Sequence, residues 1–150
     1  NETPWAGWPA LDQRLKAGHP AQALELADLG LEKNPRSAQL RFSRTVALER
    51  LGRTEEAANA LRSLIAEYPE IPEPYNNLAV IEAGMGSLEE AVTLLDRALL
   101  LNPNFATAQK NRGDVYLALA LESYEAAAPS LSSNTELQQR LKTLRRLTAH

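Results

Sequence analysis

Residues 72–105 read PEPYNNLAVIEAGMGSLEEAVTLLDRALLLNPNF. This stretch contains two segments in which apolar residues recur every three or four positions, which is the spacing of an amphipathic helix. A glycine turn at 84–86 separates the segments, and Pro103 follows the second, where it stops a helix because proline has no backbone N–H to donate. The stretch therefore predicts two helices joined by a tight turn.

The second of these helices has the clearer pattern. Ser87 and Glu90 have the spacing of a capping box, in which each side chain satisfies an unpaired backbone N–H of the first helical turn. This predicts that the helix begins at Leu88. Its apolar stripe comprises Ala91, Leu94, Leu95, Ala98, Leu99 and Leu101.

The same pattern recurs along the chain with a period of 34 residues. Three residue types keep this period in phase, so the sequence predicts stacked helix pairs that bury a continuous core. They are glycine at Gly18, Gly52 and Gly86, alanine at Ala23, Ala57 and Ala91, and proline at Pro35, Pro69 and Pro103.

The period and these residue types resemble the tetratricopeptide repeat (TPR), whose unit is two antiparallel helices, A and B, with a small residue in the turn and proline after helix B. The match is closest at Tyr75, Leu78, Ala79, Gly86, Ala91, Leu95, Ala98 and Pro103. The resemblance implies an all-α fold, a right-handed superhelical array of antiparallel helix pairs. We expect this TPR solenoid to carry a long fused helix in its fourth repeat and a capping helix at its C-terminus.

We expect residues 1–150 to form a single TPR domain. The expected repeats cover about residues 4–37, 38–71, 72–105 and an atypical 106–128, and the capping helix covers about 134–148.

The fourth repeat lacks its turn. Ala120, Tyr124 and Ala127 have the spacing of the small, aromatic and small residues of a B helix, but about five turn residues are missing before them. We therefore predict one uninterrupted helix over residues 106–128, about 33 Å long at 1.5 Å per residue, ended by Pro129.

A last helix is predicted after a polar loop. Ser133 and Glu136 have the spacing of a second capping box. The helix is basic and amphipathic, so it either caps the solenoid or touches anionic lipid or a partner. Its apolar positions are Leu137, Leu141, Leu144 and Leu147, and its cations are Arg140, Lys142, Arg145 and Arg146.

The first helix, predicted over about Trp8 to Ala17, lacks the leucine and tyrosine of the family pattern. Trp5 and Trp8 either cover the open end of the core or offer an aromatic anchor at one end of a groove. The chain begins at Asn1 rather than at methionine, and we expect a signal peptide, lipid anchor, further domain or tag to have been removed.

Composition narrows the classes of function. A net charge of −3 with 23% charged residues gives neither the basic excess of a nucleic-acid binder nor a disordered acidic tail. The absence of cysteine removes disulfides and thiolate metal sites. No apolar run approaches the roughly 18 residues that span a bilayer. We therefore expect no nucleic-acid partner, and membrane contact only through the basic last helix.

Convergent polar groups of the kind that enzymes need are scarce. His19 precedes a proline in a turn and His150 ends the chain. Two glutamate pairs, at 55–56 and 89–90, fall in the first turn of B helices, where the helix dipole favours negative charge. We therefore predict no catalytic residues, metal site or cofactor.

Arg44 and Arg112 occupy an A-helix position where the TPR family usually has leucine. Their aliphatic stems can cover the core while each guanidinium reaches solvent or a carboxylate, and a role in binding a carboxylate ligand is the alternative.

In TPR proteins the A helices line the inner, concave surface, and asparagines there commonly hold the backbone of an extended peptide. Asn77 and Asn111 lie 34 residues apart at one such position, and an amide both donates and accepts hydrogen bonds. The alternative is that asparagine is simply common there. The predicted peptide-binding groove comprises Phe42, Ser43, Val46, Arg50, Asn76, Asn77, Val80, Lys110, Asn111 and Asp114, in a wider stripe that adds Gln39, Glu73, Gly84 and Thr107.

These features predict a non-enzymatic adaptor or scaffold that binds a protein or an extended peptide, with self-association as the alternative. Phe42 and Val46 stand where a chaperone-tail clamp needs polar residues, so chaperone-tail recognition is not expected. The stretch from Tyr68 to Ala127 resembles small exported proteobacterial TPR proteins. That resemblance implies the periplasm or inner envelope, with the cytoplasm as the alternative.

Overall fold

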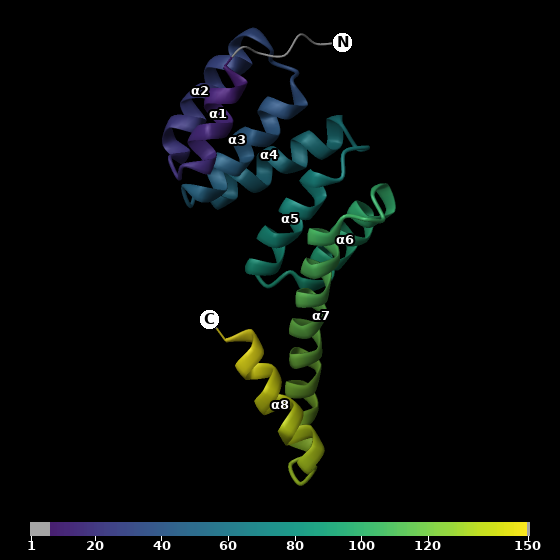
Figure 1. Cartoon of the computed structure of the whole chain (residues 1–150). Helices are drawn as coiled ribbons and strands as arrows, with labels where there is room; N and C mark the ends of the chain where they lie inside the picture. Colours follow the sequence, from purple (N-terminus) through teal and green to yellow (C-terminus); the bar gives the residue numbers. More distant parts are fainter. Residues whose placement is uncertain (1–6, 150) are drawn as a thin grey trace.

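The computed structural model describes residues 7–149, apart from the side chain of Trp8. This part of the chain is helical throughout, as the TPR pattern predicts, and Figure 1 shows its helices stacked one after another. The elements are α1 (Trp8–Lys16), α2 (Pro20–Lys33), α3 (Ala38–Arg50), α4 (Thr54–Glu67), α5 (Glu73–Gly84), α6 (Leu88–Leu101), α7 (Ala106–Ala127), the 3₁₀ turn η1 (Ala128–Ser130) and α8 (Thr135–Thr148).

The turn inside each of the first three helix pairs depends on one glycine. Gly18, Gly52 and Gly86 have φ angles of 79°, 78° and 86°. A Cβ atom is strained in this left-handed region, so the recurrent glycine is explained by backbone geometry rather than by a ligand. The predicted role of these glycines is confirmed.

Small side chains let the paired helices approach closely. Ala23, Ala57 and Ala91 are each 0% exposed. They lie in two core clusters, one built mainly from α1 to α4 and the other where α5, α6 and α7 meet. The prolines at 35, 69 and 103 each lie two residues beyond the end of a B helix, as predicted.

Both predicted capping boxes are wrong in detail. Helix α6 begins at Leu88 as expected, but Ser87 makes no side-chain capping hydrogen bond. The N-cap of α8 is Asn134 rather than Ser133, and its Oδ1 accepts from Leu137 N at 2.9 Å. Asparagine caps a helix at least as well as serine, so the adjacent residue takes the role without any change in the helix.

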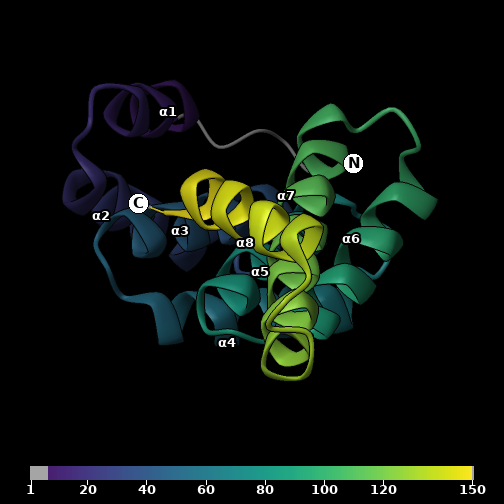
Figure 2. The ribbon, with the colours of Figure 1, turned by 90° about the horizontal axis from the view of Figure 1, so that it is seen from below.

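The prediction of a fused fourth repeat is confirmed. Helix α7 runs without interruption for 22 residues and passes into η1, which contains Pro129. Its second half projects from the array together with α8 as a helical arm (Figure 1). Figure 2 looks onto the tip of this arm from below.

Helix α8 packs on α7, with Leu137 and Leu141 buried between them. It therefore covers the second half of α7. The sequence had led us to expect a helix that closes the end of the array. The hypotheses about Trp5 and the side chain of Trp8 lie outside the described part of the chain.

Glu49 departs from the usual placement of charge on a helix. This carboxylate lies half-buried in the last turn of α3, where the helix dipole disfavours negative charge. Burial raises the pKa of Glu49 from 4.5 to about 7, and the neighbouring cation of Arg50 only partly offsets that rise.

We expect Glu49 to make stability depend on pH. The pKa of Glu49 is higher in the folded chain, so folding favours its protonated form. The contribution of Glu49 to stability is therefore fully present below about pH 4.5 and is lost as the pH rises through about 7. After allowance for solvent screening, the loss is about 1–2 kcal/mol. Urea unfolding at pH 4.5 and pH 8 should show this loss in the wild type and not in Glu49→Gln. The control Glu55→Gln, at an exposed position, should show the same loss as the wild type. If Glu49→Gln lost as much stability between the two pH values as the wild type does, Glu49 would not be the group responsible.

Candidate peptide-binding groove

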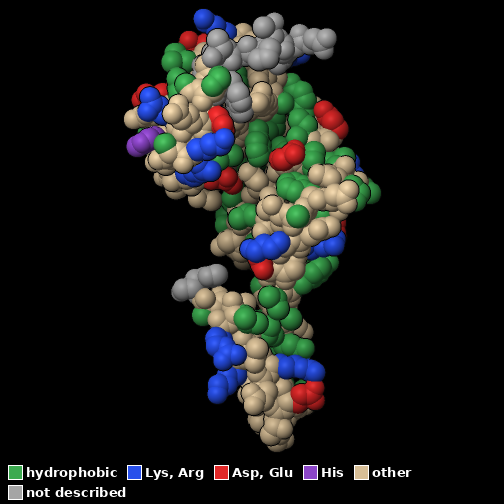
Figure 3. Space-filling model, in the orientation of Figure 1, with side chains coloured by type: hydrophobic (Ala, Val, Ile, Leu, Met, Phe, Trp, Pro, Cys, Tyr) green, Lys and Arg blue, Asp and Glu red, His purple; other side chains and the backbone are tan. Residues whose placement is uncertain are grey.

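The A helices α3, α5 and α7 line two hollows on the array. The first has a volume of about 360 Å³ and lies where α3 meets the start of α5; Gln39 and Phe42 line it from α3. The second has a volume of about 140 Å³ and lies between α5 and α7, with Val80, Asn111 and Asp114 among its lining residues. In Figure 3, hydrophobic side chains gather across the middle of the wide body that the array forms.

The first hollow includes residues that the sequence analysis did not assign to the groove. Ile71 and Pro74, from the connection between α4 and α5 and the start of α5, complete it together with Leu64 of α4. The available signal was an apolar residue and two prolines in a connecting segment, which is too common a pattern to identify a site.

Three asparagines form a chain of amides from α5 to α7. Asn76 Nδ2 donates to Asn77 Oδ1 at 3.2 Å, and Asn111 Nδ2 donates to Asn76 Oδ1 at 3.0 Å. Asn76 is buried, whereas Asn77 and Asn111 are half-buried. The outer two amides are thus oriented by a buried one, and each keeps part of its surface open to solvent.

Some predicted groove residues serve the fold. Ser43 and Asn76 are buried, so they belong to the packing between helices rather than to the open surface. Arg50 Nη1 donates to Leu15 O at 2.5 Å, where it satisfies a backbone carbonyl in the last turn of α1.

The remaining predicted residues face outward to different extents. Val80 is 51% exposed, and Phe42 and Val46 are half-buried. Lys110 and Asp114 form an exposed ion pair one helical turn apart, with 2.7 Å between Nζ and Oδ2. Such an exposed pair contributes little to stability.

Arg44 and Arg112 each pair with a carboxylate of the preceding helix. Arg44 Nε donates to Asp28 Oδ1 at 2.7 Å, and Arg112 Nη1 donates to Asp96 Oδ1 at 3.0 Å. Each pair joins an A helix to the preceding B helix, and the two pairs occur two repeats apart. This regularity supports the structural role of these arginines.

Within residues 7–149, no group of three or more histidine, cysteine, aspartate or glutamate side chains has the arrangement to hold a metal ion. His19 is the N-cap residue of α2 and makes no side-chain capping hydrogen bond. The glutamate pairs at 55–56 and 89–90 lie in the first turns of α4 and α6, as predicted. Among the described helices, none has both the length and the apolar character needed to cross a membrane.

Comparison with solved structures finds the same fold in several TPR proteins. The first TPR domain of human RPAP3 is 23% identical, with a TM-score of 0.70 over 75% of this chain and 88% of that one. A thermophilic TPR protein of Thermus thermophilus, TTC0263, is 24% identical, with a TM-score of 0.69 over 94% of this chain and 80% of that one. MamA is 19% identical, with a TM-score of 0.64 over 91% of this chain and 82% of that one.

One similar structure, the first TPR of Spaghetti (RPAP3), is bound to the HSP90 peptide SRMEEVD. It is 23% identical, with a TM-score of 0.69 over 75% of this chain and 89% of that one. Two family models described as tetratricopeptide repeat match residues 11–72 and 48–112 of the present chain. Together with the positive-φ glycines, the buried alanines and the 34-residue period, these matches establish that the chain belongs to the tetratricopeptide repeat family.

Proposed function

We propose that this protein is a non-enzymatic scaffold that holds an extended segment of another protein along α3, α5 and α7. The observation that carries the proposal is the amide chain: Asn77 and Asn111 offer donors and acceptors one repeat apart, and buried Asn76 orients both. An extended peptide presents alternating N–H and C=O groups, which amides can match.

Apolar surface beside these amides supports the same function. Val80 and the hollow around Asn111 can receive one side chain of the bound segment, and the hollow around Phe42 can receive another. Burial of two apolar side chains contributes binding free energy, while the amides set the direction and register of the peptide backbone.

The test is a selection of linear dodecapeptides displayed on phage. Peptides enriched on the wild-type protein should bind Asn77→Ala/Asn111→Ala roughly ten- to a hundredfold more weakly, since each lost hydrogen-bonding partner costs about 0.5–1.5 kcal/mol. Binding is measured by titration calorimetry, and thermal melts report on folding. Asn59→Ala, at an exposed asparagine of α4, is the matched control and should bind as the wild type does.

Two outcomes would contradict the proposal: a selection that enriches no peptide, or enriched peptides that bind the double variant with unchanged affinity. The acidic peptide SRMEEVD serves as a comparison probe. It should bind weakly here, because Phe42 and Val46 are apolar and Lys110 is paired with Asp114.

We further propose that the scaffold works in a bacterial envelope complex. The support is the resemblance of Tyr68 to Ala127 to exported TPR proteins. Immunoblots of periplasmic, membrane and cytoplasmic fractions of the native cells test this, and a purely cytoplasmic signal would refute it without affecting the binding function.

A further inference from the structure

In the fourth repeat, one face of the A helix, which is the first half of α7, is uncovered. Gly113 of α7 lies 34 and 68 residues after Ala79 and Thr45, which are 0% and 1% exposed. Gly113 itself is exposed, and a Cβ atom added to it would meet nothing within 4 Å. On neighbouring positions of α7, Tyr116 and Leu117 are 50% and 37% exposed. The surface that a B helix covers in the second and third repeats is therefore bare.

The segment that should cover this surface is the second half of α7. Ala120, Tyr124 and Ala127 correspond to B-helix positions that are fully buried in the third repeat, yet here they are only half-buried. The fully buried counterparts are Ala91, Leu95 and Ala98.

The two halves of α7 cannot meet within one chain. Gly113 and Ala120 are seven residues apart on one straight helix, which separates them by about 10.5 Å at 1.5 Å per residue. In the third repeat, by contrast, the turn at 85–87 lets Ala79 and Ala91 join the same core cluster. Without a turn, the contact that completes a repeat is available only between two molecules.

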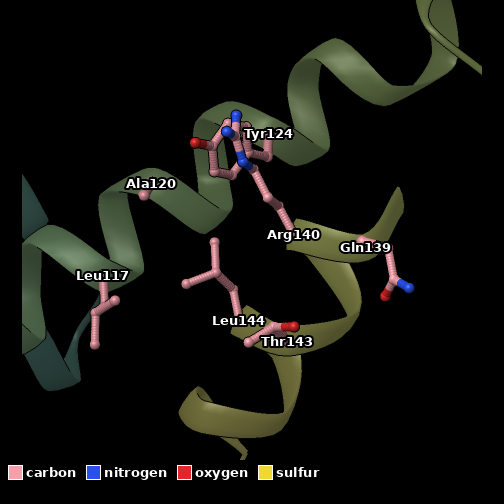
Figure 4. A pocket seen from close by; sticks show the side chains of 7 residues that line it. All are labelled: Leu117, Ala120, Tyr124, Gln139, Arg140, Thr143 and Leu144. Atoms are coloured by element: carbon pink, nitrogen blue, oxygen red, sulfur yellow. The ribbon is translucent and has the colours of Figure 1, made fainter. Parts of the chain in front are cut away.

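The second half of α7 and α8 together leave an apolar groove of about 440 Å³. Figure 4 shows Leu117, Ala120 and Tyr124 on one side of it and the α8 side chains on the other, with open space between the two helices. Tyr124 closes one end, where the guanidinium of Arg140 lies over its ring, 5.9 Å from the centroid. Within the array, α5 packs in a comparable way against both α6 and α7.

We propose that two copies of this chain form a symmetric dimer in which the first half of each α7 packs into the α7–α8 groove of the other. The two α7 helices run antiparallel about a two-fold axis near Tyr116 and Leu117. Gly113 of one copy then faces Ala120 of the second copy, and the reverse contact follows from symmetry. Each fourth repeat is thus completed by the second copy, with two small residues facing each other at the positions where Ala79 and Ala91 are buried in one core cluster of the third repeat.

The distribution of charge favours a second copy as the occupant. Residues 135–148, which form α8, carry four cations and one carboxylate, a net charge of +3. The whole chain carries −3, so its other residues carry −6. The basic side chains stand out along the arm in Figure 3. The dimer therefore brings the basic arm of each copy to a molecule whose other residues carry a net negative charge, which favours association in both directions.

Sedimentation equilibrium over a series of protein concentrations tests the dimer. The wild type of 16.5 kDa should approach twice this mass, and Gly113→Glu should remain monomeric, because the new side chain occupies the space that Ala120 of the second copy needs. The folded monomer should tolerate the substitution, since an added Cβ meets open space and glutamate favours helix more than glycine does. Gly84→Glu, also in open space, is the matched control and should dimerise.

Disulfide trapping tests the register, because the chain has no native cysteine. Gly113→Cys and Ala120→Cys are prepared separately, one with a mass tag. When the two variants are mixed and oxidised, they should form a covalent dimer that contains one chain of each. Each variant alone should form little covalent dimer, because two cysteines at the same position in the two copies lie too far apart for a disulfide, which needs Cα atoms within about 7 Å. A wild type that stays monomeric at every concentration, a Gly113→Glu variant that dimerises, or crosslinking of single variants without the mixed product would overturn the proposal. None of these readouts involves a peptide ligand.

Discussion

Replacing Leu95 by alanine is expected to lower the free energy of unfolding by about 2–5 kcal/mol. Leu95 lies at the centre of α6, is 0% exposed, and belongs to the core cluster where α5, α6 and α7 meet. Its removal loses the transfer free energy of the side chain and leaves a cavity that the neighbouring helices cannot fill without moving. The loss is large because the position joins two adjacent repeats.

Thermal and urea unfolding followed by circular dichroism measure this loss, and the midpoint should fall by about 2–4 °C for each kcal/mol in a chain of this size. The matched control is Leu100→Ala in the same helix, because Leu100 is 71% exposed. Its stability should stay within about 0.5 kcal/mol of the wild type. Equal effects of the two substitutions would show that α6 does not bury the face described here.

Much of the fold could be predicted from the residues because its determinants are local. A glycine with positive φ, a proline after a helix and a small residue at a helix contact each act within a few residues of their own position, so a 34-residue period predicts the stack. The fused helix was also predictable, because the missing turn can be counted directly between Asp114 and Ala120.

The candidate site was less predictable, because burial depends on how helices pack against one another. Asn76 and Asn77 are adjacent in sequence and both lie on an A helix, yet only Asn76 is buried. The packing of α8 was also missed. Its apolar stripe showed that the helix needed a partner, but the choice between the end of the array and the second half of α7 depends on the three-dimensional path of α7.

Restoring the missing turn is expected to convert the proposed dimer into a monomer. Inserting Gly-Met-Gly-Ser-Leu, the sequence of residues 84–88, after Leu117 places Ala120 at the repeat position of Ala91. The second half of α7 can then fold back on the first half of the same chain and cover Gly113. Once the contact forms within one molecule, exchange between copies gains no further contacts, so sedimentation equilibrium should give the monomer mass at all concentrations.

The effect of Gly113→Glu should then change in kind. In the native chain the substitution lies in open space and breaks only the dimer, so the stability of the monomer should not fall. In the chain with the inserted turn, the same glutamate is forced between two packed helices. It should lower the free energy of unfolding by about 1–3 kcal/mol through overpacking, and by more through burial of a charge. Urea unfolding of both backgrounds at a protein concentration low enough to keep the native chain monomeric gives the comparison. If Gly113→Glu has the same small effect in both, the second half of α7 is not the missing B helix of the fourth repeat, and its alanine and tyrosine stripe serves only the contact with α8.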